Sequence, residues 1–133
     1  MIQNLLRILI GLMGTALLVV GVLAWLDPGR VGNQFGLIND GPLGLGTIRG
    51  DFSGFFLLSG GFALYGALRK APQFLLVPLI LMASALFGRL GTALLSGADA
   101  ISLRYMAVEG VNVALLLIGR AVFSRADRHG RKA

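Results

Sequence analysis

Long apolar segments alternate with short polar ones along the chain, and four of the apolar segments are long enough to cross a membrane. A helix rises about 1.5 Å per residue, so about 20 apolar residues span the roughly 30 Å of hydrocarbon in a bilayer. The pattern predicts helices at Ile8–Leu26, Thr47–Leu68, Phe74–Ser96 and Leu103–Phe123. We therefore predict an all-α, four-helix membrane bundle that forms a single domain over residues 1–133.

Composition supports a membrane location. The chain is 56% hydrophobic and 14% charged, and its mean hydropathy is +0.81, whereas soluble domains are about 45–50% apolar and about 25% charged. A chain of 133 residues is too small to bury so much apolar surface from water, which excludes a soluble globular enzyme. The first apolar segment exceeds the roughly 7–15 residues of a signal-peptide core, so we expect it to be a retained helix.

The scarcity of cysteine and histidine removes several classes of chemistry. The chain has no cysteine, so disulfides, thiolate nucleophiles and cysteine-ligated clusters are excluded. The single histidine, His129, lies in the basic C-terminal segment, away from the predicted helices. We therefore predict no metal site and no cofactor. Whether the protein is an enzyme stays open at this point.

Basic residues predict the orientation of the helices, because they concentrate on the cytoplasmic side of membrane proteins. Alternating the four spans places eight basic residues on one side and three on the other, Arg30, Arg49 and Arg104. The eight are Arg7, Arg69, Lys70, Arg120, Arg125, Arg128, Arg131 and Lys132. Both termini are thus expected in the cytoplasm, with a basic tail at 124–133 and an outer loop at 27–46. Contact with anionic lipid accounts for the net charge of +6, so we predict no nucleic-acid partner.

Two charged residues fall inside the predicted spans at the same depth. Arg89 lies 15 residues beyond Phe74 on the ascending third helix, and Glu109 lies six residues beyond Leu103 on the descending fourth helix. Both positions are roughly 8–9 Å below the outer boundary. Ionisable groups inside a membrane are costly and usually pair within the bundle. The sequence therefore predicts an Arg89–Glu109 ion pair between the third and fourth helices.

Further polar residues are expected in the outer half of the bundle. Helical spacing places Thr92 and Ser96 on the Arg89 face and Asn112 on the Glu109 face. Arg49, Asp51, Asp99 and Arg104 lie near the outer ends of the helices, and with Arg89 and Glu109 they carry no net charge. Three interpretations remain open: a closed network that clamps the helices, a ligand-binding site, and a proton or ion pathway. Alternatively, Arg49 and Arg104 lie near the interface and only extend toward lipid phosphates. Asp51 alternatively only interacts favourably with the positive N-terminal end of the second helix.

Glycines and a short repeat suggest how the helices pack. Gly50-x-x-x-Gly54 and Ser84-x-x-x-Gly88 are expected to be close-packing faces. Gly14-Thr15-Ala16-Leu17-Leu18 recurs at Gly91–Leu95, which predicts two related helical hairpins, with a chance match as the alternative. The outer loop is expected to form a lid or an interfacial segment.

Two segments resemble a known family. Ile48-Arg49-Gly50-Asp51-Phe52-Ser53-Gly54, followed by Gly60-Gly61, is similar to the second-helix signature of a bacterial family of small four-helix membrane proteins of unknown function, DoxX-like in layout. Phe87-Gly88-Arg89-Leu90 with Asp99 and Glu109 resembles its third- and fourth-helix signature. The similarity covers about residues 5–123 and implies that Arg49, Arg89, Asp99 and Glu109 belong to the family pattern, whereas Asp51 does not. It implies the fold and a bacterial inner-membrane location, but no activity.

Three functions compete on the sequence alone. The first is binding of an amphipathic molecule (a lipid, an isoprenoid or a quinone-like compound) that enters from the outer leaflet. In such a site, arginines would hold an anionic or carbonyl-bearing head, and Glu109 or Asp99 would move a proton. This function predicts a cavity beside Arg89 and an incompletely paired Glu109. The second is an accessory or assembly subunit with a closed charge network and an exposed stripe of small residues. The third is a small transporter. Small multidrug exporters need a membrane-embedded acidic residue in their first helix, whereas this chain has none between Arg7 and Asp27. Glycine-rich faces also leave a homo-oligomer or a larger membrane complex open.

Overall fold

The computed structural model describes residues 1–37 and 41–130, with side chains up to residue 126. It consists of helices α1 (Ile2–Leu26), α2 (Pro28–Gln34), α3 (Gly41–Thr47), α4 (Ser53–Arg69), α5 (Leu76–Ser96) and α6 (Ala100–Gly130), the π-helical turn η1 (Ile48–Phe52) and the 3₁₀ turn η2 (Pro72–Leu75). The described residues contain no strand. Four continuous helical segments, Ile2–Leu26, Gly41–Arg69, Pro72–Ser96 and Ala100–Ala126, are long and apolar enough to cross a membrane. The predicted all-α class and the four spans are confirmed, and they indicate a multi-pass membrane protein.

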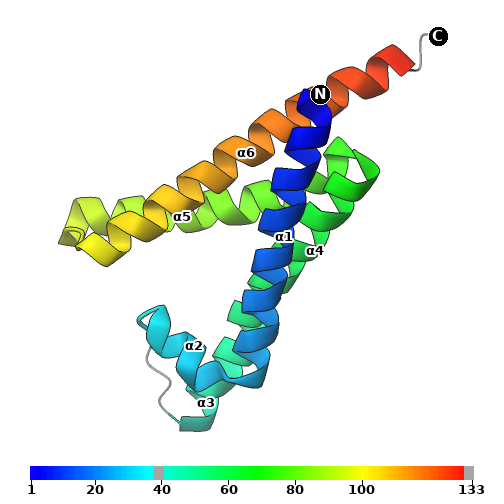
Figure 1. The fold of residues 1–133 in the computed structure, drawn as a ribbon. Coiled ribbons are helices and arrows are strands. Elements are labelled where there is room, and N and C mark those ends of the chain that lie inside the picture. The colour runs from blue at the N-terminus through cyan, green and yellow to red at the C-terminus, as the bar shows by residue number, and fades with distance from the viewer. Residues whose placement is uncertain (38–40, 131–133) are drawn as a thin grey trace.

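Helices α1 and α4 pack against each other over most of their length (Figure 1). Gly14 and Gly60 lie where the two backbones approach most closely: a Cβ on Gly60 would lie 2.6 Å from the carbonyl oxygen of Gly14. The Ser53 hydroxyl donates a hydrogen bond of 2.8 Å to the carbonyl oxygen of Gly21, and it is fully buried. The absence of side chains at these glycines allows the close approach, so α1 and α4 form a closely packed pair.

The main apolar core lies at the end of the molecule where α1 begins and α6 ends, which we call the proximal end. Leu6 and Ile10 of α1 pack there with Leu75 of η2 and with Leu116 and Phe123 of α6. At the opposite, distal end, the α5–α6 hairpin diverges from α1 and α4 (Figure 1). The helices therefore meet fully at one end only, and their divergence leaves room for cavities at the other.

Helix boundaries differ from the predicted ones mainly by extension. The first helix begins at Ile2, and the fourth continues to Gly130, because no proline or glycine pair interrupts either extension. Residues 124–130 of the predicted basic tail thus belong to α6, and residues 131–133 lie outside the described residues. The predicted outer loop, residues 27–46, contains α2 and α3, while residues 38–40 lie outside the described residues. Val31 of α2 is buried against Ala24 of α1 and Ile48 of η1, so α2 packs on the distal end of α1 and on η1.

The glycines that the sequence favoured for helix packing are not the ones that pack. A Cβ on Gly50, Gly54 or Gly88 would meet nothing within 4 Å in the described chain. These faces therefore do not pack within the described chain, because spacing identifies a small-residue face but not the neighbour that covers it. The repeated glycines also differ: Gly14 lies against α4, whereas Gly91 has open space beside it. The relation between the two hairpins stays a prediction.

Candidate functional site

Arg89 and Glu109 face each other across the α5–α6 hairpin. The hairpin reverses through Gly97, whose φ of +85° is readily adopted by glycine. Its short turn places residues of equal depth side by side, and Arg89 Nε lies 2.8 Å from Glu109 Oε1. The side chain of Glu109 is 12% exposed and that of Arg89 31% exposed. The predicted ion pair is therefore present, and it is partly buried.

Tyr105 links this ion pair to the segment that joins α1 to α4. Its ring lies one helical turn before Glu109, and the guanidinium carbon of Arg89 is 4.9 Å from the ring centroid. The Tyr105 hydroxyl donates a hydrogen bond of 3.1 Å to the carbonyl oxygen of Gln34. The same ring stacks on Phe35 at a centroid distance of 5.2 Å. These contacts join the diverging hairpin to the C-terminal end of α2.

Sequence reasoning missed Tyr105, and it placed Phe35 only in the outer loop that was expected to form a lid or an interfacial segment. The position of Tyr105, four residues before Glu109, was a usable signal because residues i and i+4 share a helix face. Phe35 gave no comparable signal, because its contact with Tyr105 joins residues 70 positions apart in the chain. Phe35 also lies 4.9 Å from the ring of Phe52 and 5.7 Å from that of Phe56. The result is a group of aromatic rings beside the ion pair.

Three cavities surround the ion pair. The aromatic cavity, about 330 Å³, lies among α1, α4, α5 and α6, and its wall includes Met13, Phe56, Tyr105, Glu109 and Asn112. The junction cavity, about 380 Å³, is lined by η1, α4, α5 and α6 and includes Asp51, Phe52, Arg89 and Glu109. Both share Phe35, Phe55, Phe56 and Glu109, so they adjoin at Glu109.

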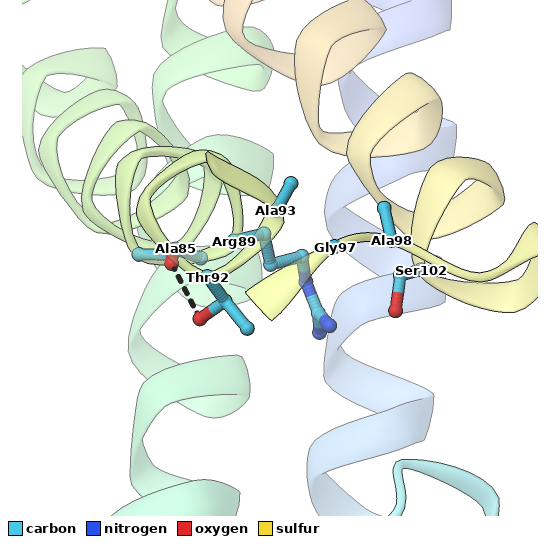
Figure 2. Close-up of a pocket in the computed structure, with 8 residues that line it drawn as sticks. Ala85, Arg89, Thr92, Ala93, Gly97, Ala98 and Ser102 are labelled. Atoms are coloured by element: carbon cyan, nitrogen blue, oxygen red, sulfur yellow. Dashed lines mark hydrogen bonds between the residues drawn. The ribbon is translucent and has the colours of Figure 1, made fainter. Parts of the chain in front are cut away.

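The turn cavity, about 310 Å³, lies on the α5–α6 turn side of Arg89. Figure 2 shows Arg89 extending from α5 into the space between Thr92 and Ser102. Small residues line the rest of this cavity: Ala85, Gly88, Ala93, Gly97 and Ala98. Arg89 and Ala85 also line the junction cavity, so the Arg89 side chain borders both cavities.

Glu109 is incompletely paired. Its Oε1 accepts the hydrogen bond from Arg89, but its Oε2 is buried and has no hydrogen-bond partner. Leaving a buried charged acceptor without a partner costs more than about 1–3 kcal/mol. Two cavities reach the same side chain. The site thus contains an unused acceptor beside empty, largely apolar space.

Some predicted members of the polar cluster lie at these cavities. Asn112 lines the aromatic cavity with Glu109, and Thr92 lines the turn cavity with Arg89. The Thr92 hydroxyl also donates to the Gly88 carbonyl oxygen, at 3.1 Å. Asp51, which the family pattern omits, lies in the wall of the junction cavity with Arg89 and Glu109.

The other predicted members lie apart from the cavities. Arg49, in the π-helical turn η1, donates from Nε to the carbonyl oxygen of Trp25 at 3.1 Å. The side chains of Arg104 and Ser96 are exposed and make no hydrogen bond or ion pair within the described chain. Asp99 is exposed in the turn and accepts a hydrogen bond of 2.7 Å from the Ser102 backbone N–H. A closed network of the six charges, one of the interpretations that the sequence left open, does not form within the described chain, because the diverging hairpins separate its members.

Asp99 caps α6, and we expect a pH dependence from it. The backbone and side-chain hydrogen bonds from Ser102 lower the pKa of the Asp99 carboxyl below its ordinary value. A pKa lower in the folded than in the unfolded protein stabilises the fold above the ordinary value of about 4, and this contribution is lost as the pH falls through the folded pKa. Thermal unfolding of wild type is therefore expected to show a stability that falls as the pH drops below about 4.

The matched control for this prediction is Asp99→Asn. Asparagine caps helices about as well as aspartate but does not titrate. The variant should match wild type once the Asp99 carboxyl is protonated at low pH, and it should lack the wild-type gain in stability above about pH 4. Identical pH profiles of the two proteins would contradict a stabilising role for the Asp99 carboxylate.

Comparison with protein-family models, curated proteins and solved structures finds no match to this chain. The resemblance to a DoxX-like family thus stays a prediction. The functional interpretation rests on the geometry around Glu109, Arg89 and the aromatic rings.

Proposed function

We propose that this protein binds an amphipathic molecule in the adjoining aromatic and junction cavities, with its polar head at the Arg89–Glu109 pair. The observation that carries the proposal is the buried Glu109 Oε2, which has no hydrogen-bond partner and lies in a side chain that lines both cavities. A clamp between helices needs no such unused acceptor, whereas a binding site needs one. The cavities each fall within the roughly 300–1,000 Å³ typical of small-molecule sites.

The walls support an amphipathic rather than a fully polar ligand. Phe35, Phe55 and Phe56 line both cavities, and Met13 and Met82 add flexible apolar contacts in the aromatic cavity. The polar groups in the walls are few: Thr47, Asp51, Arg89, Tyr105, Glu109 and Asn112. A lipid, an isoprenoid or a quinone-like compound has this distribution of polarity.

The proposal places the protein in the bacterial inner membrane with both termini in the cytoplasm. The excess of basic residues at the proximal ends of the helices supports this orientation. The cavities then lie in the outer half of the membrane, where a ligand can enter from the outer leaflet.

Filling the cavities tests the proposal. Ala16 lines the aromatic cavity and Ala85 the junction and turn cavities, so Ala16→Phe and Ala85→Phe place a ring in the proposed binding space without removing a charge. We expect native mass spectrometry of gently purified wild type, with organic extraction, to detect a defined small molecule. Each variant should retain at least roughly tenfold less of it, a loss equivalent to about 1.4 kcal/mol.

The control is Ala114→Phe, at an exposed position of α6 outside the cavity walls. It adds the same ring and should retain as much ligand as wild type. A wild-type protein with no defined ligand, or equal retention in all variants, would contradict the binding function.

A second candidate function, an accessory subunit of a membrane complex, is favoured by one observation. Gly50, Gly54, Gly88 and Gly91 have open space where their side chains would be. Small residues of this kind let a second helix approach closely in a membrane. Retention of a stoichiometric partner protein, lost on substitution of Gly54 by leucine, would support this function.

A further inference from the structure

We infer that the head group of the bound molecule is a neutral hydroxyl, which donates a hydrogen bond to Glu109 Oε2 and accepts one from Arg89. This inference rests on the proposed function and specifies its ligand class. It follows from which hydrogen-bonding groups at the cavities are already used and which are not.

Glu109 requires a donor. Its Oε1 is occupied by Arg89 Nε, and its buried Oε2 has no partner. A carboxylate oxygen only accepts hydrogen bonds. A head group that fits this atom must therefore present an O–H or N–H.

Arg89 requires an acceptor. A guanidinium has five N–H donors, and the described chain uses only the one on Nε. Tyr105 covers one face of the guanidinium through the cation–π contact, so a ligand approaches Arg89 in the plane of its remaining N–H groups. Because Arg89 is 31% exposed, these groups are accessible from the cavities it lines.

Charge and hydrogen-bonding capacity exclude the other common head groups. Glu109 already neutralises Arg89, and Asp51 adds a second carboxylate to the junction cavity. A phosphate or carboxylate head would meet this net negative charge, and once fully ionised it has no proton to donate to Glu109. An ammonium head donates but cannot accept from Arg89, and an ether or ketone accepts but cannot donate. A hydroxyl does both and carries no charge.

The geometry thus changes the expectation from sequence, in which arginines hold an anionic or carbonyl-bearing head. Arg49 donates to a backbone carbonyl oxygen, and Arg104 lies exposed outside the cavity walls. Of the described arginines, only Arg89 lines any of the three cavities around the ion pair, and it is paired with Glu109. The positive charge that an anionic head would need is therefore already neutralised.

A set of matched ligands tests the inference. Geranylgeraniol, its methyl ether and its monophosphate share one chain and differ only at the head group. Each pair is mixed in equal amounts with the full-length protein in detergent, and native mass spectrometry gives the ratio of the two complexes. We expect wild type to favour the alcohol over the ether and over the phosphate by roughly tenfold or more, as for a hydrogen bond to a charged group.

The variant Glu109→Gln keeps the size of the side chain and removes its charge. Arg89 is then no longer neutralised, so the preference between alcohol and phosphate should shift by roughly tenfold or more toward the phosphate. Arg104→Gln removes an exposed charge outside the cavity walls and should keep the wild-type ratios. A purely structural role for Glu109 would leave the ratio unchanged.

The outcomes separate the two proposals. Equal binding of the alcohol and its methyl ether, or a wild-type preference for the phosphate, would overturn the hydroxyl inference while the binding function stands. Binding of none of the three ligands would overturn both. A second competition among geranylgeraniol, a prenylated hydroquinone and a diacylglycerol distinguishes the sources of the hydroxyl, since each can be compared with its own methyl ether.

Discussion

Arg89→Ala and Glu109→Ala are each expected to lower the free energy of unfolding by about 3 kcal/mol. Removing one partner of a buried ion pair leaves the other charge without compensation, which typically costs about 3–5 kcal/mol. The partial exposure of Arg89, 31%, places the effect at the lower end of this range. Equilibrium unfolding in mixed detergent micelles, followed by circular dichroism, measures the change.

The double variant and an exposed arginine provide the controls. Arg89→Ala combined with Glu109→Ala should cost at least about 1 kcal/mol less than the sum of the single changes, because neither charge remains alone. Arg104→Ala removes an exposed side chain without a hydrogen bond or ion pair in the described chain and should stay within about 0.5 kcal/mol of wild type. Additive effects of the two single changes would contradict a direct interaction.

Gly60→Ala is expected to destabilise the α1–α4 pair by about 3 kcal/mol. A Cβ at this position would lie 2.6 Å from the Gly14 carbonyl oxygen and 2.6 Å from the Leu18 backbone nitrogen. Neither backbone atom can move without separating the helices, so the substitution costs as much as severe overpacking of a core, about 1–3 kcal/mol or more. The same unfolding experiment measures it.

The neighbouring glycine is a precise control. A Cβ at Gly61 would meet nothing within 4 Å, so Gly61→Ala should be neutral or stabilise the helix by up to about 1 kcal/mol through the higher helix propensity of alanine. Equal effects at the two positions would show that α1 and α4 do not approach at Gly60. This result would also contradict the close packing of α1 and α4, whose residues form part of the cavity walls.

A structural role and a binding role of the ion pair are compatible. The hydrogen bond between Arg89 and Glu109 Oε1 joins α5 to α6, which is the role of a clamp. The second oxygen, Oε2, takes no part in it. A single carboxylate therefore stabilises the hairpin with one oxygen and presents the other to the ligand. The stability measurements test the first role, and the ligand ratios of Glu109→Gln test the second.

The sequence by itself determined the four spans and the Arg89–Glu109 pair. Hydropathy identifies the spans because a membrane requires about 20 consecutive apolar residues whatever their neighbours. The constant rise of a helix gives the depth of each residue, and the short turn at Gly97 brings equal depths of α5 and α6 together. The placement of Asn112 on the Glu109 face follows from helical periodicity in the same way.

Only the tertiary structure decided where the hairpins separate and what lies between them. Three features depend on how whole helix surfaces fit together. Close packing occurs at Gly14 and Gly60 and not at Gly50 and Gly54. Tyr105 contacts Phe35, and the charged residues Arg49, Asp99 and Arg104 lie apart from one another. Hydropathy and spacing describe one helix at a time, whereas close packing is a property of two surfaces and of the angle between them. For this reason the charged pair follows from local periodicity, but the cavities that give it a proposed function do not.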